Sequence, residues 1–188
     1  MFKVASSKAL GFGVLAVAAW LLSMLMAGFM SGAGGPGGGA PLPLLGVFAG
    51  VGLLVAGIVA FLRSEAWLGF FFVFWAAVAW SFGGVLLSGW LWLAIALVNF
   101  YLWLAAGRAG LESAVGFIAF LLGVDALGQG LNGVVGLFWA GQIGAYFGLA
   151  AAAVSFYVSA AFAMCPEGCD RMPKMGRKHP PRSESTTV

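Results

Sequence analysis

Three polar side chains interrupt a long apolar segment around residue 125. Asp125, Gln129 and Asn132 are separated by four and three residues, which places them on one face of a helix. Asp125 lies about twelve residues into its apolar segment, a depth of roughly 18 Å at about 1.5 Å per residue. An ionised carboxylate facing lipid there is costly, so Asp125 must face a water-filled path, pair with a hydrogen-bond donor or stay protonated.

This polar stripe has two interpretations. In the first, it lines a permeation route, and Asp125 is a proton carrier. In the second, it is a hydrogen-bonded clasp between helices that contributes only to packing. The donors available for such a clasp are Asn99, Tyr101 and Gln142. Both roles are compatible with the same residues.

The other residues capable of chemistry do not indicate an enzyme. The sequence contains no His-x-x-x-His pair, no glycine loop followed by lysine and no second carboxylate within an apolar segment. Cys165 and Cys169, with His179, fall in a polar tail and lack a fourth metal ligand, so a zinc site is not expected. We therefore expect no catalytic residue, no metal and no cofactor.

The composition identifies the solvent in which the chain folds. Hydrophobic residues make up 62% of the 188 residues, charged residues 8%, and the mean hydropathy is +1.03. A soluble domain has about 25% charged residues, so we expect an all-α integral membrane protein with membrane lipid as its immediate partner. The net charge of +3 does not indicate nucleic-acid binding, because the basic residues lie between and beyond the apolar segments.

Six apolar segments are long enough to cross a membrane as helices. A glycine-rich link at 31–41 separates the first two segments, and residues 67–106 are long enough for two helices with a turn at Ser88-Gly89 or, as the competing position, Gly83-Gly84. The predicted helices cover 9–30, 42–62, two parts of 67–106, 114–131 and 134–164. The expected organisation is a cytoplasmic N-terminus at 1–8, a six-helix transmembrane domain at 9–164 and a basic, disordered cytoplasmic tail at 165–188.

The distribution of basic residues predicts the orientation. With six crossings, all nine basic residues fall on one side of the membrane, which places both termini in the cytoplasm of a multi-pass protein of the cell (inner) membrane. These residues are Lys3, Lys8, Arg63, Arg108, Arg171, Lys174, Arg177, Lys178 and Arg182. A cleaved signal peptide at 1–33 is the alternative for the N-terminal segment, although its apolar run of 22 residues exceeds the usual length of about 7–15.

Small residues at four-residue spacing predict where helices pack closely. Helix association in lipid depends on such residues, because lipid is as apolar as the helix surface. The pairs Gly46 with Gly50 and Gly144 with Gly148 have this spacing, although a chain with 30 glycines also produces such pairs by chance. Trp67, Trp90 and Trp103 lie near predicted helix ends, as expected of anchors at the membrane interface.

The order of these features resembles the acetate/succinate uptake transporter family, whose members have six helices, a similar length and a hexameric assembly. The resemblance extends over most of residues 9–164. The matching positions are Phe48, Gly50 and Ala56-Gly57 in the second helix, Trp80 in the third, and Ala140-Gly141, Gly144, Gly148 and Ala151 in the sixth. The resemblance implies a homo-oligomer, a hexamer in this family, and a small organic acid as the substrate.

The sequence departs from the family pattern at several sites. Only Leu10-Gly11 remains of the N-terminal signature, Leu53 replaces a glutamine, and Asp125 has no counterpart. The family's pore narrows at a phenylalanine, a tyrosine and a leucine. The corresponding residues here are Leu15, Ala76 and Phe120. Ala151 is a further residue of the expected pore wall.

Three functions remain open at this point. The resemblance favours a channel or transporter for small monocarboxylates such as acetate, proton-coupled through Asp125, with one path in each protomer. A fixed carboxylate repels an anion, however, which favours a channel for neutral solutes such as urea or short amides. The third hypothesis is a non-transporting accessory subunit of a larger membrane complex, in which the small-residue faces bind the partner.

Overall fold

The computed structural model describes residues 7–29, 42–84, 88–108 and 113–164, and these residues form six helices. The helices are α1 (Ser7–Met26), α2 (Leu42–Leu62), α3 (Ala66–Gly84), α4 (Gly89–Arg108), α5 (Ser113–Val135) and α6 (Phe138–Met164). The glycine-rich link at 31–41 and the tail at 165–188, with Cys165, Cys169 and His179, lie outside the described residues.

The length and composition of these helices indicate a multi-pass membrane protein. Among the described residues, α1, α4, α5 and α6 are each long and apolar enough to cross a membrane. The described parts of α2 and α3 are also apolar, but shorter. A helix satisfies its backbone hydrogen bonds internally, as a segment surrounded by lipid requires.

Local backbone chemistry explains where several helices begin and end. Gly28 has a φ of +84°, and the N–H of Phe29 donates to the carbonyl of Met24 at 3.1 Å, a Schellman arrangement that ends α1 at Met26. At the start of α4, the Ser88 hydroxyl accepts a hydrogen bond from the N–H of Leu91 at 3.4 Å, as an N-cap does. α3 ends at Gly84 and α4 begins at Gly89, so the break between these helices lies between the two predicted turn positions, and residues 85–87 lie outside the described residues.

The boundary between the fifth and sixth helices differs from the predicted one. We expected a break after residue 131, whereas α5 continues to Val135 and turns at Gly136, which has a φ of +75°. Gly133 lies within α5 and faces Gly89 of α4. A Cβ on Gly133 would lie 2.7 Å from the Gly89 Cα. The first predicted helix was likewise too long at its C-terminal end.

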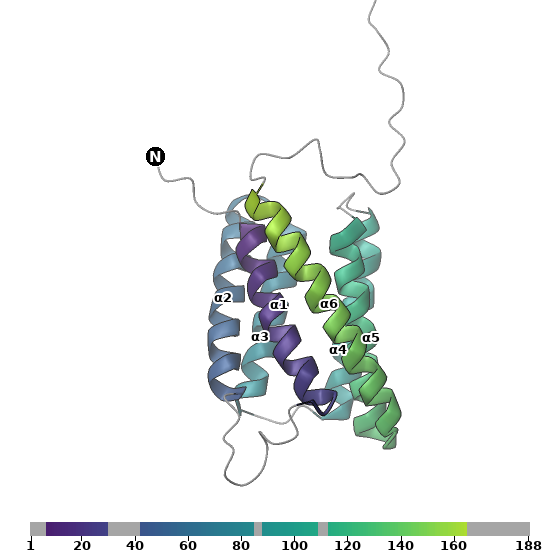
Figure 1. The fold of residues 1–188 in the computed structure, drawn as a ribbon. Coiled ribbons are helices and arrows are strands. Elements are labelled where there is room, and N and C mark those ends of the chain that lie inside the picture. The colour runs from purple at the N-terminus through teal and green to yellow at the C-terminus, as the bar shows by residue number, and fades with distance from the viewer. Residues whose placement is uncertain (1–6, 30–41, 85–87, 109–112, 165–188) are drawn as a thin grey trace, which may run out of the picture.

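The six helices form an antiparallel bundle (Figure 1). Their contacts and the hydrogen bonds between α3 and α4 connect them as a ring in chain order. α1 packs against α2 and α6, α2 against α3, α4 against α5, and α5 against α6. Two tryptophans join α3 to α4: Trp67 Nε1 donates to the Leu102 carbonyl at 3.2 Å, and Trp75 Nε1 donates to Asn99 Oδ1 at 3.3 Å. The start of α1 and the end of α6 lie at the same end of the bundle (Figure 1).

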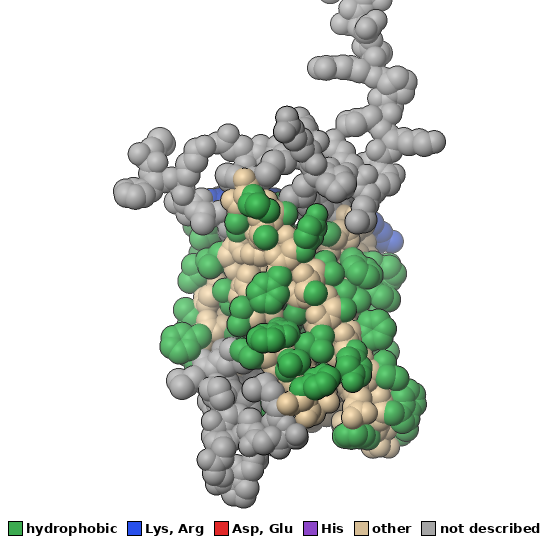
Figure 2. Space-filling model, in the orientation of Figure 1, with side chains coloured by type: hydrophobic (Ala, Val, Ile, Leu, Met, Phe, Trp, Pro, Cys, Tyr) green, Lys and Arg blue, Asp and Glu red, His purple; other side chains and the backbone are tan. Residues whose placement is uncertain are grey.

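The charged side chains of the described residues gather at that end, apart from Asp125. Lys8, Arg63, Glu65 and Arg108 all lie next to or just beyond helix termini there, and we call this the basic end. Figure 2 shows that the surface of the helices facing the viewer, below the basic end, carries mainly apolar side chains. Large exposed side chains such as Leu97, Phe117 and Phe138 continue this apolar exterior, as expected of a surface in contact with lipid.

Candidate functional site

Asp125 lies in the interior of the helical ring. It is 7% exposed and belongs to the face of α5 that also carries Ile118, Leu122 and Gln129, all of them buried. Its Oδ1 accepts a hydrogen bond from Gln129 Nε2 at 3.3 Å. The donor is therefore the neighbour one turn along the same helix, and not Asn99, Tyr101 or Gln142.

Gln129 connects this carboxyl group to the neighbouring helix. Its Nε2 also donates to the carbonyl of Gly141 in α6 at 3.1 Å, so the two amide hydrogens join Asp125 to α6. Asn132, the third residue of the stripe, is partly buried, and its side chain lies against Gly141. All three polar residues thus lie along the contact between α5 and α6.

Ser23 of α1 approaches the same place from a third helix. It is 1% exposed, and its Oγ has no hydrogen-bond partner among the described residues. A Cβ added to Gly148 of α6 would collide with Ser23 Oγ and would lie 2.6 Å from Asp125 Oδ2. The missing side chain of Gly148 therefore leaves the space in which the two oxygens meet. Sequence reasoning missed Ser23, because a single serine in an apolar helix has no periodic pattern.

A second buried polar pair lies between α3 and α4. Asn99 is fully buried, accepts the hydrogen bond from Trp75 and donates through Nδ2 to the Ile95 carbonyl at 2.9 Å.

Ser155 of α6 is 1% exposed, and its Oγ, like that of Ser23, has no hydrogen-bond partner among the described residues. The interior of the ring therefore contains polar groups from α1, α3, α4, α5 and α6.

An aromatic layer closes the interior near the basic end. The layer consists of Phe12, Phe71 and Phe72, each 0% exposed, with Phe162 at its edge. Phe12 meets Phe72 edge to face at a centroid separation of 5.1 Å and stacks on Phe162 at 6.4 Å. Gly11 allows this packing, because a Cβ there would collide with the Phe72 ring. Sequence reasoning did not identify this layer, although the run of phenylalanines at 70–72 was a visible sign of it.

An ion pair covers the aromatic layer at the basic end. Lys8 Nζ lies 3.0 Å from Glu65 Oε1 and 5.3 Å from the centre of the Phe162 ring. Ser159 Oγ donates to the carbonyl of Ala9 at 2.7 Å. These contacts hold the start of α1 to the α2–α3 connection and to α6.

The three residues aligned with the family's constriction, and the wall residue Ala151, occupy two kinds of position. Leu15, Ala76 and Ala151 are at most 1% exposed and belong to the central apolar core. Phe120 is partly buried and packs at 5.1 Å from the Trp103 ring, in a cluster that also includes Phe100 and Phe117. At about 100° per residue, Phe120 and Asp125 point to nearly opposite sides of α5.

The glycines expected at helix contacts are buried. A Cβ on Gly144 would lie 2.8 Å from the carbonyl oxygen of Asp125, and one on Gly50 would collide with the Trp80 indole. Gly46 is buried in α2. Gly128 of α5 lies in the same helix contact, because a Cβ there would collide with the carbonyl oxygen of Ala140 and lie 2.8 Å from the Gly144 Cα. The sequence did not single out Gly128.

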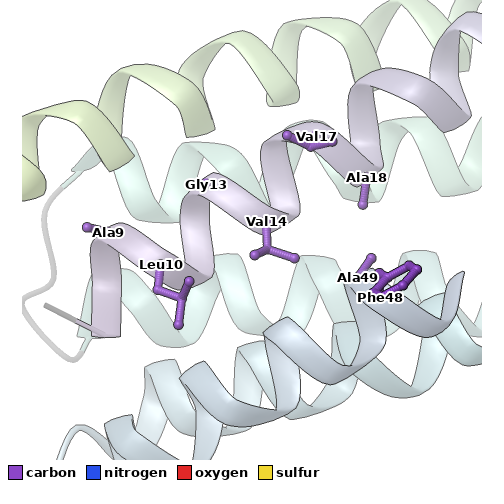
Figure 3. A pocket seen from close by; sticks show the side chains of 8 residues that line it. All are labelled: Ala9, Leu10, Gly13, Val14, Val17, Ala18, Phe48 and Ala49. Atoms are coloured by element: carbon purple, nitrogen blue, oxygen red, sulfur yellow. The ribbon is translucent and has the colours of Figure 1, made fainter. Parts of the chain in front are cut away.

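A separate pocket of about 400 Å³ lies between α1 and α2 (Figure 3). Val14 and Ala18 of α1 point toward Phe48 and Ala49 of α2 across it. The remaining lining residues are Ala9, Leu10, Gly13 and Val17. All these side chains are apolar, and Phe48 is 73% exposed, so the pocket is a groove on the outer surface and does not reach the polar residues around Asp125.

Comparison with known proteins identifies the fold and leaves the family open. No protein-family model matches the chain, and no curated protein matches it. Among solved structures, the bacterial acetate channel SatP superimposes on it with a TM-score of 0.73 at 13% sequence identity. The alignment covers 87% of this chain and 94% of the channel. The chain therefore shares its overall fold with that acetate channel.

Proposed function

We propose that this protein is a membrane channel or transporter for small monocarboxylates such as acetate. The observation that supports the proposal most is the shared fold with an acetate channel over 87% of the chain. Fold alone does not determine function. The buried polar groups inside the ring add to the argument, because polar side chains at membrane depth are costly and usually serve a pathway.

The proposed path runs through the interior of each six-helix protomer. Leu15, Ala76 and Ala151 form part of its apolar wall, and Asp125 with Gln129 provides the polar contacts. The basic end faces the cytoplasm, in agreement with the positive-inside rule, and six crossings place both termini there. By resemblance to the uptake transporters, the protomers assemble into a hexamer in the inner membrane.

The position of Asp125 limits the form in which the acid crosses. Within the described residues, Lys8 and Glu65 form an ion pair at the basic end, and no ion pair involves Asp125. An ionised Asp125 would repel a carboxylate, whereas a protonated one would not. The proposal is therefore proton-coupled transport, in which Asp125 is protonated while the acid passes.

Uptake of labelled acetate into proteoliposomes tests this function. We expect uptake by the unaltered protein, loss in Asp125→Leu and retention in Asp125→Asn, which keeps a neutral polar group of the same shape. Leu127→Ala is the matched control, because Leu127 lies on the exposed face of the same helix. Retained uptake in Asp125→Leu would contradict the role of Asp125.

A channel for neutral solutes is the second candidate. It is favoured by the same observation that limits the first: a buried carboxyl group without a cationic partner among the described residues. Labelled urea and acetamide belong in the same uptake assay. Urea uptake without acetate uptake would replace the monocarboxylate proposal with this one. Absence of flux for all three solutes, together with co-purification of a larger membrane protein, would indicate an accessory subunit.

A further inference from the structure

Two oxygens from different helices face the same glycine in the interior of the ring. Asp125 Oδ2 and Ser23 Oγ both lie within 2.6 Å of the position that a Gly148 Cβ would occupy. Ser23 Oγ accepts and donates no hydrogen bond among the described residues, although the side chain is 1% exposed. A buried hydroxyl without a partner is unfavourable by about 1–3 kcal/mol, so a ligand for it is expected at this point.

The surroundings of Asp125 contain no described positive charge. The helices that pack around it are α4, α6 and α1. Their ionisable side chains, other than those at the basic end, are Tyr101, Tyr146 and Tyr157, and each is more than half exposed on the outside of the bundle. Lys8 is paired with Glu65, and Arg108 is the last residue of α4. A charge on Asp125 would therefore be uncompensated.

We propose that Asp125 and Ser23 form a proton-binding site over Gly148. Gln129 donates to Asp125 Oδ1, which identifies Oδ1 as the carbonyl oxygen and Oδ2 as the hydroxyl that carries the proton. The two oxygens are close enough for a single water molecule to bridge them. The Oδ2 hydroxyl donates to this water, and the water donates to Ser23 Oγ. No covalent bond other than the O–H bond forms or breaks when the proton arrives or leaves.

The number of ligands favours a proton over a metal cation. Hard metal cations need about six oxygen ligands in close geometry. Here two side-chain oxygens converge, and the adjacent Asp125 Oδ1 is already bound by Gln129. A proton needs only one oxygen to hold it and one to accept its hydrogen bond.

The site joins three helices. Asp125 belongs to α5, Ser23 to α1 and Gly148 to α6, so loss of the proton would remove a link between α1 and the α5–α6 pair. A role for this site in transport rests on the proposed function. The existence of the proton-binding site does not depend on that function.

Infrared difference spectroscopy of the protein in lipid at neutral pH tests the site. We expect a carbonyl band of a protonated carboxylic acid, assigned by its loss in Asp125→Asn. In Ser23→Ala the band should move to higher frequency, because the hydroxyl of the acid loses its hydrogen-bonded chain. Ser155→Ala is the matched control. The Ser155 hydroxyl is as buried as that of Ser23 and also has no hydrogen-bond partner among the described residues, but it lies about two turns from Gly148 along α6. The carbonyl band of Asp125 should not move in this variant.

Three outcomes separate the hypotheses. Absence of the band from the unaltered protein, or a band in Ser23→Ala identical to that of Ser155→Ala, would overturn the site. The Ser23→Ala comparison remains decisive even where Asp125→Asn fails to fold. The predicted bands without uptake of acetate would leave the site standing and contradict only the proposed function.

Discussion

Replacing Gly144 by alanine tests how closely α5 and α6 must approach. The new Cβ would lie 2.8 Å from the carbonyl oxygen of Asp125 and 3.1 Å from the Cα of Gly128. Both are backbone atoms of a helix, so no change of side-chain rotamer relieves the contact. The two helices must separate by a few tenths of an ångström, which also lengthens the hydrogen bond from Gln129 to Gly141.

The expected cost follows from two opposing effects. Overpacking a well-packed contact destabilises a protein by about 1–3 kcal/mol. Alanine has a higher helix propensity than glycine, by about 1 kcal/mol, which offsets part of that cost. We therefore expect Gly144→Ala to lower the free energy of unfolding by up to about 2 kcal/mol, and to be about 1–3 kcal/mol less stable than a glycine-to-alanine variant that gains only helix propensity.

The assay is equilibrium unfolding in mixed detergent micelles, followed by tryptophan fluorescence. Gly107→Ala is the matched control, because a Cβ there meets nothing within 4 Å and leaves only the gain in helix propensity. The control should be as stable as the unaltered protein or slightly more so. If Gly144→Ala were as stable as Gly107→Ala, the close approach of α5 and α6 would be wrong.

Two further substitutions test the contacts that close the ring. Trp75→Phe removes the donor to Asn99 and should lower the free energy of unfolding by about 0.6–2 kcal/mol. In a protein that already carries Asn99→Leu, the same substitution should have little effect, because the hydrogen bond is already absent. Equal costs in the two backgrounds would contradict the hydrogen bond. Glu65→Gln breaks the ion pair with Lys8, and because both side chains are about a third exposed, we expect a loss below about 1 kcal/mol that shrinks at high salt. A salt-independent loss in thermal stability would assign the effect of Glu65 to packing.

The sequence predicts the helices better than their ends. Apolar length and charge position define six segments, because each helix must satisfy its backbone within lipid. The end of α5 was misplaced because Asn132-Gly133 resembles a break, whereas in the structure Gly133 is a helical residue whose missing side chain leaves room for Gly89 of α4. α5 ends at Val135, directly before Gly136 with its positive φ.

The candidate site shows a similar limit. The spacing of Asp125 and Gln129 indicates a shared face of one helix, and both side chains are buried in the structure. The contribution of Ser23 could not be predicted, because it depends on which helices are neighbours in space. Periodicity within one segment contains no information about contacts with α1, and the aromatic layer from α1 and α3 was missed for the same reason.

For the proposed path through the ring, the distribution of polar and aromatic groups favours an uncharged solute. Ser23 and Gln129 lie toward the end of the bundle opposite the basic end, whereas Phe12, Phe71 and Phe72 lie within the first turns of helices that begin at the basic end. A solute that crosses the interior would exchange polar contacts for this aromatic layer. An isolated carboxylate loses tens of kcal/mol of solvation in an apolar medium, but a protonated carboxyl group loses only about 2–7 kcal/mol. The layer would therefore select the undissociated acid even without Asp125, and replacing Phe12 by a smaller residue should reduce that selectivity.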